Sequence, residues 1–236
     1  MVMPILVLLA AIGFALSPLL APGFGGFDAD QFPIPQVDPP VQPAGYAFGI
    51  WGLIYVWLIA GAAYGLWQRR DDAGWAAMRV PLLVTLAVGI TWLPIAVTSS
   101  IWATILIWVM WVFAVWAVLR APSGTGSDAW LGRAPVALYA GWLTAASCVS
   151  LGLMAAGYGG MNQVLAAILA LLIALALAVL IARQRPDAFG YMAGVIWALI
   201  GVCVQNAQDG SMTVLVLAAV GAAGLIALGG TNISRS

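Results

Sequence analysis

The chain changes character at residues 43–55, which read PAGYAFGIWGLIY. A loop rich in proline and aspartate ends there, and a long apolar run with many aromatic rings begins. Eleven of the twelve tryptophans lie between Trp51 and Trp142. Such a density of rings in apolar segments indicates either a site for a flat or lipid-like ligand or close packing between helices. Both alternatives require long apolar helices.

The composition is that of a membrane protein. Of the 236 residues, 64% are hydrophobic and 7% are charged, whereas a soluble domain carries about 25% charged residues. Too few polar side chains remain to cover a surface in water, so lipid must surround most of the chain. The apolar runs are continuous and do not alternate with polar residues, which excludes a transmembrane β-barrel. The sequence therefore predicts an all-α, polytopic helical membrane protein.

Eight segments are long enough to cross the hydrocarbon core of a bilayer, which takes about 20 residues. They are residues 2–21, 44–67, 80–98, 101–119, 135–157, 162–182, 188–206 and 212–230. All eight basic residues are arginines, and they lie in the loops after even-numbered segments or in the C-terminal tail. Because short cytoplasmic loops collect positive charge, we expect both termini in the cytoplasm. We expect an integral protein of a bacterial inner membrane.

The long loop on the opposite side, residues 22–43, contains six prolines and three aspartates. Loops longer than about 12–15 residues are uncommon unless they have a function. Phe24, Phe27 and Phe32 give this loop an apolar side. We interpret the loop as a lid over a cavity that opens outward. The alternative is a connector that its prolines stiffen.

The residue types present give little support to catalysis. The chain has no histidine, lysine or glutamate, and no aspartate or arginine falls inside a predicted span. Histidine is the usual base at neutral pH and a common metal ligand, and ion-coupled transporters place ionisable groups at membrane depth. Cys148 and Cys203 lack a metal-type spacing and are interpreted as small buried hydrophobic residues. We therefore expect no enzyme, no metal site and no proton relay.

Two patterns concern helix packing. The G-x-x-x-G pairs Gly61/Gly65 and Gly190/Gly194 allow another helix to approach closely. Residues 45–54 and 190–200 also resemble one another although their spans run in opposite directions, as in the inverted repeats of transporters. A transporter therefore stays open as an alternative to a binding protein.

Aromatic residues and prolines recur at set spacings in three of the predicted spans. They are Pro43, Tyr46, Phe48, Trp51 and Tyr55, then Trp92 and Pro94, then Tyr139 and Trp142. This spacing resembles that of the TspO/translocator protein family, also known as tryptophan-rich sensory proteins or peripheral benzodiazepine receptors. In that family the second helix begins with a proline, an aromatic pair and W-x-x-x-Y, the third carries W-x-P and the fifth Y-x-x-W. Gly89 and Ser150 stand where relatives have asparagines.

The resemblance implies a TspO-like five-helix region at residues 1–157, with the loop 22–43 as its external lid, and three additional transmembrane helices at residues 158–236. Family members bind porphyrins and other hydrophobic small molecules beneath the loop between their first two helices. The corresponding ligand site here would be lined by Phe48, Trp51, Tyr55, Trp92, Trp111, Tyr139 and Trp142. On the lid, Phe24, Phe27 and Phe32 would cover it.

We therefore expect a membrane sensor or regulator that binds a hydrophobic planar small molecule. A tetrapyrrole, a carotenoid and a sterol-like molecule are the candidates, and the sequence does not decide between them. The alternatives are a transporter or facilitator of such molecules and a structural or assembly subunit of a larger pigment–protein complex in the membrane. The expected partners are membrane lipid, the hydrophobic ligand, and a second copy of the chain or the subunits of such a complex, with no nucleic acid.

Overall fold

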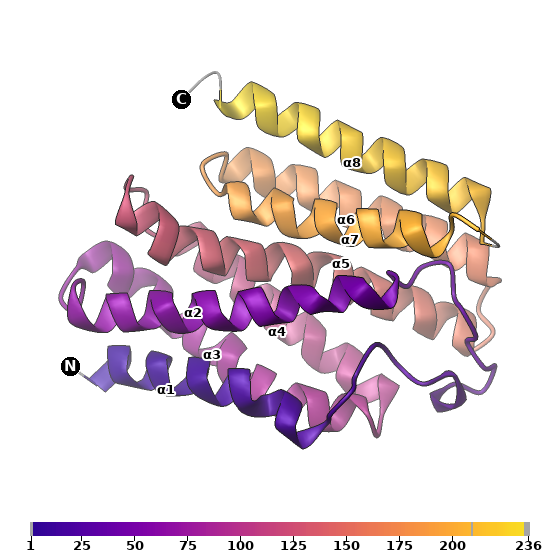
Figure 1. Cartoon of the computed structure of the whole chain (residues 1–236), viewed down its shortest axis with the longest axis horizontal. Coiled ribbons are helices and arrows are strands. Elements are labelled where there is room, and N and C mark those ends of the chain that lie inside the picture. Colours follow the sequence, from indigo (N-terminus) through magenta and orange to yellow (C-terminus); the bar gives the residue numbers. More distant parts are fainter. Residues whose placement is uncertain (1, 209, 234–236) are drawn as a thin grey trace.

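The computed structural model describes residues 2–208 and 210–233, and within them the chain forms eight α-helices and no strand (Figure 1). The helices are α1 (Val2–Leu16), α2 (Ile50–Trp67), α3 (Ala73–Ala96), α4 (Ser100–Arg120), α5 (Ala134–Gly157), α6 (Gln163–Gln184), α7 (Phe189–Gln205) and α8 (Met212–Ile233). In the described ranges, seven helical segments are long and apolar enough to cross a membrane, and α7 is a shorter apolar helix of 17 residues. The prediction of an all-α, polytopic membrane protein is confirmed.

Helix α5 lies at the centre of the bundle. It packs against α4 and α2 on one side and against α6 and α7 on the other. Helix α8 lies against α7 and α6 at the edge of the bundle, far from α1 (Figure 1). Helix α1 begins and α8 ends at the same end of the bundle (Figure 1), as an even number of crossings requires.

Helices α5 and α7 touch backbone to backbone through glycines. Gly141 of α5 faces the backbone carbonyl of Tyr191, and a Cβ on Gly194 of α7 would lie 2.6 Å from the carbonyl oxygen of Leu138. No side chain other than hydrogen fits at these two positions. The expected close approach at the Gly190/Gly194 pair therefore occurs, and its partner is a helix of the same chain.

Helix α3 begins earlier than the sequence predicted, at Ala73 instead of residue 80. The carboxylate of Asp72 accepts a hydrogen bond from the backbone N–H of Trp75 at 2.9 Å, which caps the first turn. Arg79, predicted to lie in a loop, is therefore inside α3 and only 5% exposed. Its guanidinium donates to the carbonyl of Gly65 in the last turn of α2 and to those of Arg69 and Arg70 just after the helix, where the helix dipole favours a cation.

Asp187, in the turn between α6 and α7, holds a second group of arginines at the same end. Its carboxylate lies 2.9 Å from Nε of Arg185 and 3.3 Å from Nη1 of Arg133. Burial opposes ionisation of Asp187, but the hydrogen bond and charge of Arg185 and the charge of Arg133 outweigh it and lower the pKa of the carboxyl. Arg185 also donates to the carbonyls of Val118 and Ala121 at the end of α4. The group joins α4, α5, α6 and α7.

Candidate ligand cavity

A small cavity lies at the end of the bundle opposite the arginines, beneath the loop that joins α1 to α2. Counted as space open to the centre of a water molecule, its volume is about 40 Å³. This is room for a few waters and far less than a porphyrin needs. The lining residues are Phe24, Gly26, Phe27, Gln42, Pro43, Phe48, Trp92, Ile107, Trp142, Ala145, Ala146, Val149, Ser150, Leu153 and Ala198.

Five of the ten residues that the sequence proposed for the site and its lid come together around this cavity. They are Phe24 and Phe27 of the loop, Phe48 just before α2, Trp92 of α3 and Trp142 of α5. Phe24 meets the ring of Trp92 edge to face at 5.3 Å between centroids, and Phe48 meets Trp142 in the same way at 5.8 Å. Edge-to-face contacts of this kind stabilise aromatic clusters, so the wall is a connected set of rings.

Trp51, Tyr55 and Tyr139 lie elsewhere, in an aromatic cluster one layer deeper in the bundle. Trp51 and Tyr55 stack at 5.5 Å, and both rings meet the edge or face of Phe14 of α1 at 5.7 and 5.0 Å. Tyr139 completes the cluster at 5.6 Å from Phe14. Trp51 also lies 6.1 Å from Trp142, so this cluster supports the cavity wall from behind. Phe14 carries no signal in the sequence, because its helix is otherwise aliphatic.

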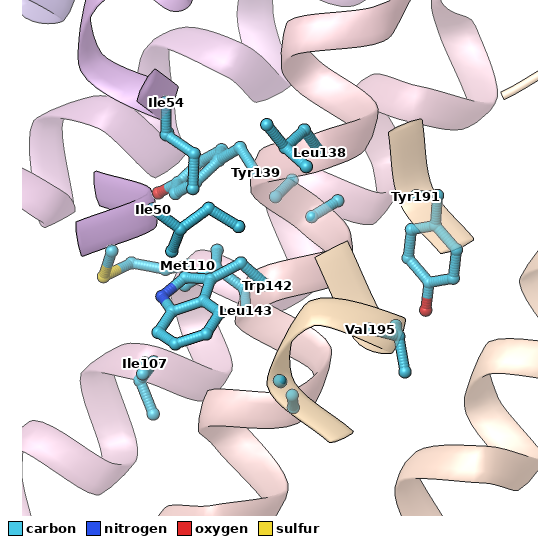
Figure 2. Close-up of a cluster of buried hydrophobic side chains, with 14 of the residues drawn as sticks. Ile50, Ile54, Ile107, Met110, Leu138, Tyr139, Trp142, Leu143, Tyr191 and Val195 are labelled. Carbon is cyan, nitrogen blue, oxygen red and sulfur yellow. The ribbon is translucent and has the colours of Figure 1, made fainter. Parts of the chain in front are cut away.

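Helix α5 has different neighbours on its two sides, as the close-up of the core shows (Figure 2). Trp142 and Tyr139 leave α5 on the side of Ile50 and Ile54, which belong to α2 (Figure 2). Tyr191 of α7 lies on the other side of α5 (Figure 2). The ring of Trp142 thus lines the cavity from the α2 side of α5, and α7 contributes Ala198 to the lining.

Trp111 does not line the cavity but belongs to a buried polar cluster. Its indole N–H donates to Oγ1 of Thr144 at 2.8 Å, and the hydroxyl of Tyr191 lies 2.7 Å from the same oxygen. Thr144 gives its own proton to the carbonyl one turn earlier at 2.9 Å, so Tyr191 is the donor in its contact. A similar pair, Thr85 and Tyr139, meets at 2.9 Å. These bonds join α3, α4, α5 and α7 at membrane depth.

Phe32, proposed as part of the lid, lies against the end of α5 and is not among the residues that line the cavity. Its ring is 4% exposed and lies against Gly157, where a Cβ would approach it to 2.5 Å. The backbone N–H of Ile34 donates to the carbonyl of Gly157 at 2.9 Å beside it. Gly157, at the end of α5, therefore leaves the room in which the ring of Phe32 packs and holds this part of the loop.

The second half of the loop is fixed to the bundle by hydrogen bonds. Asn206, at the end of α7, donates to the carbonyl of Pro40 at 2.8 Å, and Gln31 donates to Ala96 at the end of α3 at 3.0 Å. Within the described chain, residues 22–27 make no such bond; Gly23 and Gly26 there have φ values of 82° and 130°. The loop therefore has a fixed rim, residues 31–44, and a part held mainly by aromatic contacts, residues 22–28.

The two positions where relatives carry asparagine have different surroundings. A Cβ on Gly89 would lie 2.6 Å from the ring of Phe14, so glycine makes room for the deeper aromatic cluster. Ser150 lines the cavity, and its hydroxyl donates to the carbonyl of Ala146 at 2.9 Å. Only the second position lies beside a prospective ligand.

The chemistry of the cavity is that of apolar contact and stacking. None of its lining residues is ionisable, and the described chain holds no cluster of three or more side chains able to ligate a metal. The polar groups at hand are Gln42, Ser150 and the indole of Trp142. That indole N–H is buried and has no hydrogen-bond acceptor among the described residues.

These features define an integral membrane protein built of apolar helices, with a small aromatic cavity near one membrane face. The family model described as TSPO-like protein matches residues 33–231. The chain therefore belongs to the TSPO-like protein family, which confirms the resemblance drawn from the aromatic spacing. No curated protein and no solved structure matches the chain. Family membership suggests a ligand-binding or sensor role in the membrane, and it leaves the ligand open.

Proposed function

We propose that the chain is a membrane sensor or regulator that binds a hydrophobic planar small molecule in the aromatic cavity, with a tetrapyrrole as the first candidate. The observation that carries this proposal is the ring-lined wall formed by Phe48, Trp92 and Trp142 beneath Phe24 and Phe27 of the loop. Flat ring systems gain stacking and edge-to-face contacts from such a wall. A mostly apolar pocket with few polar groups is the usual form of a small-molecule site.

Binding requires the loop to open, because the closed cavity holds only about 40 Å³. Residues 22–28 are the part that can lift, since Phe24 and Phe27 hold them by ring contacts and glycines flank the rings. Residues 31–44 stay in place through their bonds to α3, α5 and α7. The ligand would replace the ring contacts that Phe24 and Phe27 make in the closed state.

In this proposal the protein binds its ligand and neither converts it chemically nor transports it. The lining residues offer no general base and no nucleophile activated by one, which hydrolysis would need. They also lie in the half of the bundle nearest the loop, as Trp142–Leu153 of α5 and Ala198 of α7 illustrate. A separate cavity of about 20 Å³ lies in the other half, between α1, α2, α3 and the start of α5, and no residue lines both it and the aromatic cavity. A transporter would need a path that joins the two.

The indole N–H of Trp142, which has no acceptor among the described residues, favours a ligand that can accept a hydrogen bond. A buried N–H without an acceptor is unfavourable by about 1–3 kcal/mol. A ligand atom that accepts a hydrogen bond, such as a carboxylate or carbonyl oxygen, would remove that penalty. Acceptor-bearing tetrapyrroles are therefore preferred over a pure hydrocarbon such as a carotene.

The test is a titration of the detergent-purified protein with protoporphyrin IX, read by quenching of tryptophan fluorescence. Ala146→Leu adds bulk inside the cavity and keeps every tryptophan. Ala155→Leu is the matched control on the same helix, because Ala155 does not line the cavity. We expect saturable quenching, a loss of affinity of about tenfold or more in Ala146→Leu, which corresponds to roughly 1.4 kcal/mol, and no change in Ala155→Leu.

Equal affinity in the three proteins would contradict the assignment of the cavity. Absence of saturable quenching by protoporphyrin IX, a carotenoid and a sterol alike would contradict the binding function itself. A structural or assembly role would then be the remaining alternative, and it predicts co-purification with other membrane subunits.

We further propose that the loop 22–43 faces the outside of a bacterial inner membrane and that the arginine end faces the cytoplasm. The positive-inside rule supports this orientation, because the seven described arginines lie at the end away from the loop. Protease added to spheroplasts should then cleave the chain in the loop, and cleavage only after lysis would contradict the orientation.

A further inference from the structure

A second, smaller cavity lies directly beside the aromatic one, and the proposed function does not use it. It is enclosed by the loop and by α5, α6 and α7, and its volume on the same measure is about 10 Å³. Its lining residues are Val41, Pro43, Ala145, Cys148, Val149, Ala170, Leu171, Ala174, Val195, Ala198, Leu199 and Val202. We refer to it as the aliphatic cavity, because no aromatic ring is among these residues.

The two cavities share one wall. Pro43, Ala145, Val149 and Ala198 line both of them. These side chains are small or rigid, and none of them donates or accepts a side-chain hydrogen bond. The division between the cavities therefore consists of a few methyl groups and one proline ring.

The spacing of α5 and α7 explains why space remains there. The helices run in the same direction and are in backbone contact where Gly141 faces Tyr191 and Gly194 faces Leu138. Ala145 and Ala198 come one turn after these glycines on the side of the loop. A methyl group at each of these positions keeps the two backbones further apart than the glycines do, and both alanines line the aliphatic cavity.

Helix α6 forms the far side of the aliphatic cavity. Ala170, Leu171 and Ala174 face it, and all three are buried. Alanine at two successive turns of α6 leaves room beside the short side chain of Cys148 of α5, which also lines the cavity. A narrow, irregular apolar space of this kind suits a flexible hydrocarbon chain better than a ring.

We propose that the natural ligand has two parts, a flat ring system in the aromatic cavity and an aliphatic or isoprenoid tail in the aliphatic cavity between α5, α6 and α7. The inference rests on the proposed function and adds to it the chemical class of the ligand. The tail displaces no hydrogen bond, since both sides of the shared wall are apolar. Each methylene group of the tail that enters the aliphatic cavity exchanges contacts with lipid or detergent for contacts with the protein. The affinity therefore depends on how well the cavity fits the tail.

The experiment compares two tetrapyrroles that differ only in the tail, pheophorbide a methyl ester and its phytyl ester, pheophytin a. Affinity is measured by tryptophan quenching in one detergent for the full-length protein. The variants Ala174→Val and Ala174→Leu fill the aliphatic cavity in two steps and leave the aromatic cavity unchanged. Ala178→Leu is the matched control, because Ala178 is buried on the same helix one turn further on and lines neither cavity.

We expect the wild type to bind the phytyl ester about tenfold more tightly than the methyl ester, a gain of about 1.4 kcal/mol, because the tail exchanges contacts with detergent for closer packing against the protein. Ala174→Val should reduce this ratio, and Ala174→Leu should bring it to about one without changing the affinity for the methyl ester. Ala178→Leu should keep the ratio of the wild type. Thermal unfolding of each variant shows whether it is folded, and the valine variant gives an answer even where the leucine variant does not fold.

Binding of both esters with equal affinity by the wild type would overturn the tail site and leave the proposed function standing. Ala174→Val and Ala174→Leu variants that still prefer the phytyl ester would also overturn the tail site and leave the proposed function standing. Partition of the phytyl chain into detergent would then explain the preference. Failure of both esters to bind would overturn the tail site together with tetrapyrrole binding.

Discussion

Addition of one methyl group at Gly141 tests whether the backbone contact between α5 and α7 holds the bundle together. In an isolated helix, replacing glycine by alanine is favourable by roughly 0.5–1 kcal/mol. At Gly141 the new Cβ would overlap the carbonyl oxygen of Tyr191 and lie 2.9 Å from its carbonyl carbon. A backbone carbonyl inside a helix cannot turn away as a side chain does, so α7 must move as a whole.

The size of the effect follows from what that movement breaks. Overpacking of a tight core costs about 1–3 kcal/mol, and the displaced Tyr191 would also weaken its hydrogen bond to Thr144, which is a loss of roughly 0.6–1.7 kcal/mol for bonds between membrane helices. After subtraction of the helix-propensity gain, we expect a net loss of about 1–4 kcal/mol for Gly141→Ala. For a chain of this size each kcal/mol lowers Tm by about 2–4 °C.

Thermal unfolding in detergent, followed by circular dichroism, measures this loss. The control is Gly52→Ala on α2, where nothing lies within 4 Å of the added Cβ. We expect Gly52→Ala to unfold at or slightly above the temperature of the wild type and Gly141→Ala to unfold several degrees below it. Gly141→Ala that is as stable as Gly52→Ala would refute the close contact of α5 with α7.

Three further predictions concern the polar cluster, the arginine end and the lid. Thr144→Val removes the acceptor of two buried donors and should cost about 1–3 kcal/mol of stability, whereas Thr144→Ser should be close to wild type in the same melting assay. The pKa of Asp187 is lowered in the folded protein. The ionised carboxylate therefore stabilises the fold above the unfolded pKa of about 3.9, and this stabilisation is lost as the pH falls through the lower folded pKa. A melting series from pH 7 to pH 3 should show this loss of stability in the wild type and a smaller one in Asp187→Asn. Phe24→Ala should weaken protoporphyrin IX binding or speed its entry in stopped-flow quenching, whereas Phe32→Ala should loosen the anchored part of the loop, read as faster proteolysis; identical results for the two variants would contradict the division of the loop.

The spans were predictable from the sequence because length and apolarity alone determine them. Counted with the 3₁₀ turns Ser17–Leu20 and Gly45–Gly49, which extend α1 and α2, the predicted and observed segments agree within a few residues except at α3. Helix α3 begins at Ala73 rather than residue 80. There the first turns of the helix lie beyond the uniformly apolar part and include Arg79. A hydropathy criterion places that arginine in a loop, whereas its hydrogen bonds to the end of α2 allow it to be buried within a helix.

The ligand site was only partly predictable because both faces of a membrane helix are apolar. In a soluble protein the polar face shows which side of a helix points outward, but α2 offers no such face. Trp51 and Tyr55 therefore could not be assigned from the sequence to the cavity or to the cluster around Phe14. The contribution of Ala198 was equally hidden, since an alanine among apolar residues carries no signal. The division into residues 1–157 and 158–236 stays a prediction.

Hydrogen-bonding needs of the indole group supply the directional information that hydropathy lacks. An N–H at membrane depth has no water to bond, so a buried indole gains from turning toward an acceptor. Among the described residues, the buried indoles of Trp108 and Trp142 have none. Trp92 finds the carbonyl of Ala103 on α4 at 2.9 Å, and Trp197 finds that of Ala47 at 2.8 Å. These bonds fix the neighbours α3 and α4 and join α7 to the start of α2. Trp142 is buried without an acceptor among the described residues, and it lines the cavity. A ligand with an acceptor atom in reach of this N–H would give Trp142 the hydrogen bond that backbone carbonyls give Trp92 and Trp197.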